Sequence, residues 1–210
     1  MERYEVPPER LGRWLDRWAD AHDPVVRTEV GRDRVVFLGA DGARLEADPP
    51  FGGLEPSRHD GFAPGPLLEH VGRERVVGVL LVRLGGHAAG VFAGRRLIDS
   101  KVGRRNVHGR HKAGGQSQQR FARRREGQAR VAMQAAADVA ARVLLPHRAD
   151  LEALVLGGDR RALATVLEDP RLRDLARLGV ERVLDVPDPR LDVLRATPER
   201  FLATVLRPVD

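Results

Sequence analysis

Apolar residues recur at helical spacing near the start of the chain. Positions 11 to 18 repeat at intervals of three and four, which predicts a helix that begins after Pro7 and Pro8 and ends before Pro24. Its apolar positions are Leu11, Trp14, Leu15 and Trp18. Trp beside Leu on one helix face is usually buried, so both tryptophans are expected in a core, with stacking on nucleic-acid bases as the alternative.

Short apolar runs follow, separated by turn residues. Residues 25–26, 35–38 and 43–47 are expected to form strands, and together with the helix they predict a small α+β domain over residues 1–48. Residues 49–69 are rich in Pro and Gly. This composition predicts a linker, or an ordered loop, at a domain boundary.

A second domain is expected over residues 70–210. The near-continuous apolar run at 76–84 is typical of a strand that is covered on both faces, and 88–92 and 97–100 continue it as a meander with Gly-rich turns. A helix is then predicted from Ser117 or Gln118 to about Leu145, where Pro146 stops it. Its apolar positions are Ala129, Met133, Ala136, Ala140 and either Val143 or Leu144. The first turns hold arginines instead, so this half is expected to project from the domain.

The remaining residues alternate between strand and helix patterns. Strands are expected at 151–156 and 180–186, and helices at 160–167, 172–178 and 191–206. Asp159 is a predicted N-cap, and the last helix restarts at Thr197 and Pro198, as N-cap and first helical residue. The fold class that follows is α/β, a mixed sheet with helices on its faces.

Composition excludes several classes of chemistry. The chain has no Cys, which removes disulfides, thiolate-bound metals and a Cys nucleophile. Its scattered acids and histidines (His59, Asp60, His70, His87 and His147) lack metal-ligand spacing, so no metal or other cofactor is expected. No apolar run is long enough to span a bilayer and no signal-peptide pattern is present, so the sequence predicts a cytoplasmic protein without a membrane partner.

Positive charge is concentrated in one segment. Residues 101–130 hold ten basic side chains and one acid, Glu126, a formal charge of +9, whereas the whole chain carries +6. The rest of the chain is therefore negative by three charges. A solvated face usually mixes both signs, so this segment predicts contact with a polyanion, most commonly nucleic acid.

A glycine turn lies at the centre of this segment. Gly114 and Gly115 allow backbone conformations and close approach that a Cβ would block, and Gln116 follows them at the start of the predicted helix. A helix N-terminus favours a phosphate or a developing oxyanion. The tripeptide by itself is equally compatible with a solvated Gly-rich loop, and the functional interpretation depends on its basic surroundings.

The order of meander, Arg-rich GGQ loop, long helix and alternating strands and helices resembles the central domain of eukaryotic and archaeal class I peptide-chain release factors. The string RHKAGGQSQQRFAR at 110–123 is similar to the Vms-like release factor branch, which has an actinobacterial peptidyl-tRNA hydrolase group. The resemblance covers residues 70–207 and implies an RNase H-like fold. Eukaryotic members carry a zinc finger, which a chain without Cys cannot have, so ribosome docking must differ.

The resemblance also implies an activity, hydrolysis of peptidyl-tRNA on stalled ribosomes. The tip of the loop, Gly114, Gly115 and Gln116, would enter the peptidyl-transferase centre of the large subunit. The Gln116 amide would position the water, and a backbone N–H of Gly115 or Gln116 would face the oxyanion. The side chains expected to hold tRNA phosphates are Arg104, Arg105, Arg110, His111, Lys112, Arg120, Arg123, Arg124 and Arg125.

Three alternatives remain at the level of the sequence. His108 and His111 titrate near neutrality, so an acid–base pair that cuts the tRNA acceptor end is the enzymatic alternative. A ribosome- or RNA-binding module without catalysis is the second. DNA binding is disfavoured, because proteins that read a groove present a rigid helix or ribbon and not a Gly-Gly tip.

Overall fold

The computed structural model describes residues 2–83, 85–104 and 117–209, and for 117–126 and 181 it describes the backbone alone. The chain forms two compact units, residues 1–74 with 198–210 and residues 75–197. The structure thus divides the chain differently from the expected domains 1–48 and 70–210 with a linker at 49–69. Both chain ends belong to the first unit, because its C-terminal strand pairs within the N-terminal sheet.

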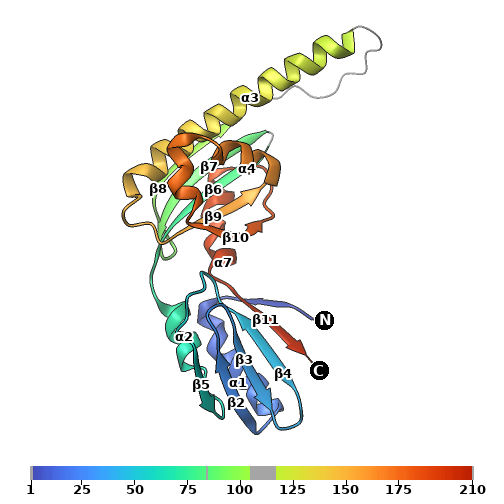
Figure 1. Ribbon diagram of the computed structural model, residues 1–210, viewed down its shortest axis with the longest axis vertical. Coiled ribbons are helices and arrows are strands. Elements are labelled where there is room, and N and C mark those ends of the chain that lie inside the picture. Colours follow the sequence, from blue (N-terminus) through green and yellow to red (C-terminus); the bar gives the residue numbers. More distant parts are fainter. Residues whose placement is uncertain (1, 84, 105–116, 210) are drawn as a thin grey trace. The chain divides into compact units, whose positions relative to one another are not determined.

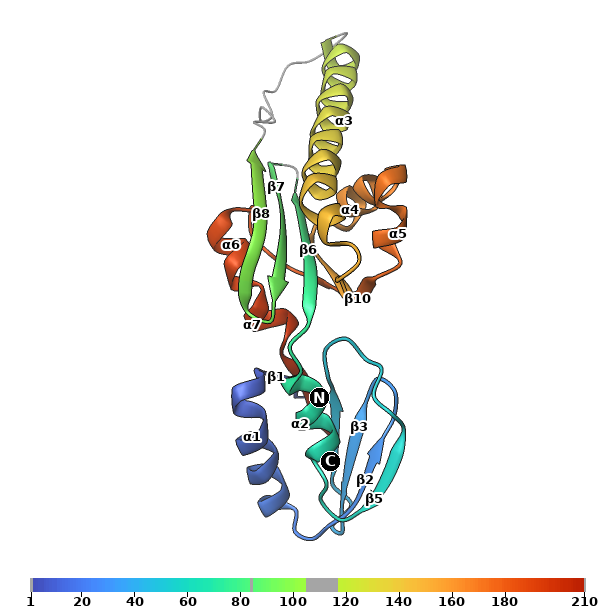
Figure 2. The same cartoon turned by 90° about the vertical axis from the view of Figure 1, so that its left-hand side faces the viewer.

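The first unit is an antiparallel sheet with two helices on one face (Figure 2). Its strands follow the order β1-β11-β4-β3-β2-β5, and α1 and α2 cover a core built around Leu11, Leu15 and Phe37. The elements are β1 (Tyr4–Val6), α1 (Pro8–Ala21), β2 (Val25–Val30), β3 (Val35–Gly39), β4 (Arg44–Asp48), β5 (Ser57–Asp60), α2 (Gly65–Gly72), α7 (Pro198–Phe201) and β11 (Thr204–Val209).

The predicted linker is a folded part of this unit. It contains β5 and α2, and Leu54, Leu67 and Val71 are buried in the core. Its Pro and Gly residues therefore mark turns inside a domain. Of the two tryptophans, Trp18 is 8% exposed and belongs to the core, whereas Trp14 is partly buried and packs against Tyr4 with ring centroids 5.5 Å apart.

The C-terminal strand corrects a prediction from the sequence. A helix was expected over 191–206, but helix ends at Phe201 and β11 follows between β1 and β4. Pro198 opens α7 as predicted, whereas the Thr197 hydroxyl donates to the Leu194 carbonyl oxygen at the end of α6 (Leu191–Ala196). The strand tolerates Pro208 because β1 pairs only with Thr204–Leu206, before the proline.

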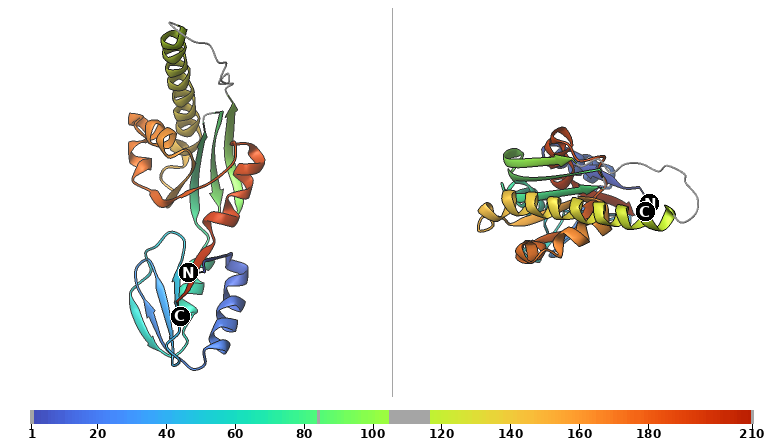
Figure 3. Two further views of the ribbon diagram at one scale, coloured as in Figure 1. Left: turned by 90° about the vertical axis from the view of Figure 1, so that its right-hand side faces the viewer. Right: turned by 90° about the horizontal axis from the view of Figure 1, so that it is seen from above.

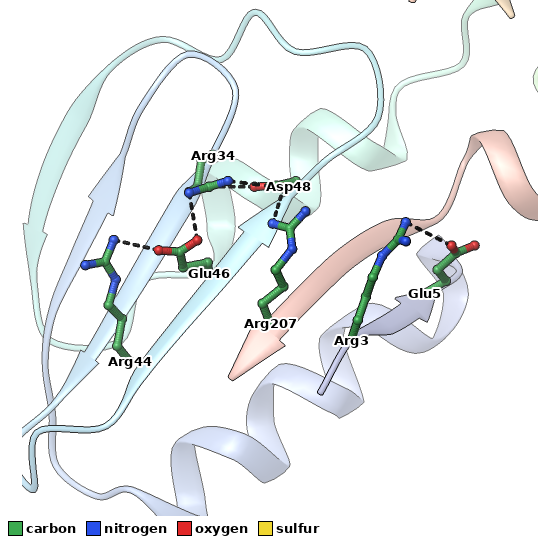
Figure 4. Close-up of polar contacts among 7 residues, drawn as sticks. All are labelled: Arg3, Glu5, Arg34, Arg44, Glu46, Asp48 and Arg207. Carbon is green, nitrogen blue, oxygen red and sulfur yellow. Dashed lines mark hydrogen bonds and ion pairs between the residues drawn. The ribbon is translucent and has the colours of Figure 1, made fainter. Parts of the chain in front are cut away.

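Ion pairs join β11 to its neighbours on the outer sheet face (Figure 4). Asp48 on β4 accepts from Arg207 of β11 and from Arg34, whose Nε lies 2.6 Å from Oδ1. Glu46 pairs with Arg34 and Arg44 at 2.7 Å each. Burial opposes ionisation of Asp48, yet the hydrogen bonds from Arg34 and Arg207 outweigh it and lower the pKa of this carboxyl.

The second unit is a mixed five-stranded sheet in the order β10-β9-β6-β7-β8. β6, β7 and β8 form the predicted antiparallel meander, and β9 and β10 run parallel to β6, which confirms the RNase H-like α/β fold class. The elements are β6 (Val76–Arg83), β7 (Gly86–Ala93), β8 (Arg96–Arg104), α3 (Ser117–Leu144), η1 (Leu145–His147), β9 (Ala153–Gly158), α4 (Arg160–Leu167), η2 (Pro170–Leu172), α5 (Arg173–Ala176), β10 (Gly179–Leu184) and α6.

Helices cover both faces of this sheet. α3, α4 and α5 lie on one side and α6 on the other (Figure 3). α3 approaches the sheet closely because its buried positions are small, as at Ala136, Ala137 and Ala140. The predicted cap is confirmed, since the Asp159 carboxylate accepts from the N–H groups of Arg161 and Ala162 at 2.8 and 2.9 Å.

Candidate nucleic-acid interface

The segment with the GGQ sequence joins the edge strand β8 to the long helix α3. β8 ends at Arg104, and α3 begins at Ser117. β8 runs in the same direction as β6, β9 and β10, so the carboxyl ends of these four strands share one edge of the sheet (Figure 1). In open α/β sheets this edge is where ligands bind. The basic segment therefore starts from the edge at which the fold class usually carries its site.

Most of the predicted site residues lie outside the described residues. Arg104, by contrast, is described as the exposed last residue of β8. The arginines at 120, 123, 124 and 125 belong to α3, described there by backbone alone. Three groups of predicted residues lie outside the described residues. They are the catalytic set Gly114, Gly115 and Gln116, the RNA-binding residues Arg105, Arg110, His111 and Lys112, and His108 of the nuclease alternative. Their roles stay predictions.

α3 is anchored at one end and extends past the sheet at the other (Figure 2). From Ala132 to Leu144 it packs on the core, with Ala136 and Ala140 fully buried. Gly127–Arg130 are partly or fully exposed, as expected for the projecting half. The first turn carries no acid, so nothing there neutralises the partial positive charge of the helix N-terminus, next to Gln116 in sequence. That end of the helix suits an anion.

Polar contacts hold the C-terminal half of α3 and the turn η1 that follows it. Arg171 in η2 pairs with Asp138 at 2.7 Å, and His147 in η1 lies 3.5 Å from Asp99 on β8. The first contact joins α3 to η2, and the second joins η1, which directly follows α3, to the strand that leads into the basic segment. The two ends of that segment are thus attached to one packed body.

A buried histidine lies under the last residues of β8. His87 on β7 is the cross-strand partner of Gly103 and is 6% exposed. A Cβ at position 103 would overlap Nε2 of His87 and lie 2.7 Å from its Cε1. The imidazole therefore occupies the place of a side chain at 103. Sequence reasoning missed this pair, because a lone His next to an apolar run carries no signal of its cross-strand partner.

Charge differs strongly between the units. The first has 12 basic and 17 acidic residues, so its formal charge is −5, which leaves +11 on the second. At the sheet edge, Arg83 pairs with Asp185 at 3.1 Å, and Arg160 and Arg161 open α4 beside Gly158. The excess positive charge of the chain therefore lies in the second unit.

The described part of the chain lacks both a metal-binding cluster and a membrane-spanning helix. No group of three or more His, Asp or Glu side chains there lies in a position to hold a metal ion. Among the same residues, no helix is long and apolar enough to cross a membrane.

Comparison with protein families gives one assignment. The family described as "Actinobacteria/chloroflexi VLRF1 release factor" matches residues 75–207, well over half of the chain. The match runs from β6 into β11 and includes the GGQ sequence. No curated protein matches at a significant level.

Solved structures give only distant similarities. An archaeal translation termination factor, aRF1, is 15% identical with a TM-score of 0.46 over 95% of this chain, which spans 66% of the archaeal one. Pelota of Archaeoglobus fulgidus is 11% identical with a TM-score of 0.32, and 95% of this chain aligns with 63% of it. This chain thus spans slightly less than two thirds of either protein.

Proposed function

The chain belongs to the actinobacterial and chloroflexi VLRF1 release factor family, and we propose that it frees nascent chains on stalled ribosomes by hydrolysing the ester of peptidyl-tRNA. The family match carries the proposal, because it covers the whole mixed sheet and the segment at 105–116. The anchored half of α3 and the shared edge of the strands support it, since both ends of that segment start from a packed body. Because ribosomes act in the cytoplasm, the proposed function places the protein there.

Gln116 is the residue proposed to position the water. Water attacks the ester carbonyl, the bond to the ribose oxygen breaks, and the peptide leaves with a free carboxylate. The Gln116 amide can accept from the water and donate to the substrate, but it has no titratable proton. The proton that water loses must reach the departing ribose oxygen through the terminal 2′-OH or solvent. A backbone N–H of Gly115 or Gln116 would stabilise the oxyanion.

The basic residues are proposed to hold the tRNA acceptor end. Arg104 at the strand end and the arginines of α3 stand on opposite sides of Gln116 in the sequence, and the family match includes both. Phosphate contacts fix register without reading bases, which suits a factor that must accept any tRNA. The positive end of α3 would favour the same phosphates or the developing oxyanion.

The test is a product analysis on purified stalled ribosome–peptidyl-tRNA complexes. Wild type and Gln116→Ala are compared, and the tRNA 3′ end is resolved at single nucleotides. Release of peptide with an intact tRNA end, lost in the variant, is the expected result. A shortened tRNA would replace hydrolysis with the nuclease alternative and direct attention to His108 and His111. Absence of release that depends on Gln116 would leave an RNA-binding protein without this activity.

A further inference from the structure

The basic segment leaves the sheet at the end of β8, at Gly103 and Arg104. Among the described strands β8 lies at the edge of the sheet and pairs with β7 alone, and its last pairs are Gly103 with His87 and Arg104 with Gly86. Edge strands fray easily at their ends, because hydrogen bonds on one side alone resist the motion. A contact that stabilises these two strand pairs would therefore also fix the position at which the basic segment leaves the sheet.

His87 makes a contact of this kind with the end of β8. Its ring lies where a side chain of residue 103 would be, with the Nε2 edge against Gly103. Val82 is its partner on β6 and belongs to the core under α3, so the ring lies on the face that α3 covers. Cross-strand contact of this kind stabilises a pair of strands. Burial lowers the pKa of His87, which favours the neutral form of the ring.

Gly103 is the matching half of the contact. Its φ lies outside the left-handed region, so the strand conformation does not itself require glycine. The requirement comes from the imidazole, because an added methyl group would overlap Nε2 and lie 3.0 Å from Cδ2. Both residues are therefore constrained by each other, immediately before Arg104 and the segment at 105–116.

We propose that His87 is a positioning residue for peptide release, and that its contact with Gly103 fixes the end of β8 from which the segment with Gln116 departs. This inference rests on the proposed function. Catalysis by a placed water is sensitive to small displacements, and an error of about 1 Å can cost on the order of a hundredfold in rate. Loosening the end of β8 should therefore lower kcat for release and leave binding to the ribosome nearly unchanged.

A double-mutant cycle tests the contact. Gly103→Ala forces the methyl group against the imidazole and should lower kcat by about tenfold or more. His87→Ala removes the ring and should cost about tenfold. In the double variant the methyl group enters the space that the ring has left, so kcat should be no lower than in His87→Ala alone. Losses that multiply would mean that the residues act independently and would overturn the proposal.

Gly78→Ala is the matched control. Its Cβ would lie 3.2 Å from Leu144 and 3.3 Å from Leu154, so it also crowds this sheet, but at the opposite end of β6. It should lower thermal stability without a specific loss of kcat. If Gly78→Ala reduced kcat as much as Gly103→Ala, general destabilisation would explain both losses and the positioning role would fail.

Amide hydrogen exchange supplies a readout that does not need activity. His87→Ala should speed exchange at the amides of Lys101–Arg104 and leave β6 protected. Unchanged exchange there overturns the positioning role, whatever the release assay shows. If the wild type shows no release that depends on Gln116, the proposed function fails, and the positioning role in release fails with it.

Should His87→Ala not fold, His87→Val takes its place in the double-mutant cycle. Valine also removes the imidazole from the space next to Gly103, and it favours strands.

Discussion

Arg171 donates to Oδ1 of Asp138 at 2.7 Å, and this bond joins η2 to the half of α3 that packs on the sheet. The same guanidinium donates to both carboxylate oxygens of Asp169, at 2.9 and 2.7 Å. One arginine thus connects two carboxylates from different elements. Since α3 also carries the basic residues proposed to contact tRNA, the triad steadies the helix that presents them.

Acid should weaken this triad. The hydrogen bond from Arg171 lowers the pKa of Asp169 to about 2 from an ordinary 3.8. A carboxyl whose pKa is depressed in the folded state stabilises the fold above its unfolded pKa and loses that contribution as the pH falls through the folded pKa. Arg171→Ala should therefore lower Tm slightly at neutral pH, and the difference from wild type should shrink between about pH 4 and pH 2.

Circular dichroism melts across this pH range measure the effect. Arg177→Ala is the control, because the ion pair of Arg177 with Asp174 is long, at 3.7 Å, and the Arg177 side chain is 77% exposed. It should shift Tm far less than Arg171→Ala at every pH. A constant difference between wild type and Arg171→Ala from pH 7 to pH 2 would contradict the linkage to Asp169.

The cap of α4 gives a second stability prediction. Asp159 accepts from two backbone N–H groups of the first turn, so Asp159→Ala should destabilise the protein by about 1 kcal/mol. Asp159→Asn keeps an oxygen acceptor and should recover most of the loss. Urea unfolding of the three proteins measures this. Equal losses in both variants would show that the carboxylate charge, and not the cap, is responsible.

Local signals predicted most of the second unit. Gly turns and apolar runs delimited the meander, Pro146 marked the end of the long helix, and Asp159 marked the start of α4. Each of these depends on residues that are near one another in sequence. The α/β class followed from their order, and the structure confirms it.

Long-range pairing was what the sequence could not supply. The strand at Thr204–Val209 continues a helical pattern, and its partners β1 and β4 lie at the other end of the chain. The same reason explains why Pro and Gly at 49–69 suggested a linker and why the contact of His87 with Gly103 was missed. The catalytic role of Gln116 was implied by a resemblance of motif, and it stays a prediction.

Salt dependence should separate local charge from net charge. Replacing Arg123, Arg124 and Arg125 together by Ala removes three proposed phosphate contacts, so ribosome or tRNA affinity should fall and the slope of log Kd against log salt should decrease by up to about 3. Arg10, Arg13 and Arg17 form a matched control, with equal charge on α1 of the acidic unit. The control triple variant should keep the wild-type slope. Equal slopes in both triple variants would mean that the arginines of α3 make no phosphate contacts.

Gln116→Ala should separate catalysis from binding. The substitution removes the amide that is proposed to hold the attacking water but none of the cationic side chains, so kcat for release should fall by about a hundredfold or more while Kd for the ribosome complex changes less than about threefold. Gln118→Ala, which removes the same side chain two residues later, should keep nearly full activity. Single-turnover release at saturating protein measures kcat, and sedimentation with stalled ribosomes measures Kd. If Gln116 alone contacts the ester, loss of the amide at position 118 should have little effect on kcat. An equal loss of kcat in Gln118→Ala and Gln116→Ala would therefore assign the effect to the start of α3 as a whole, and not to Gln116.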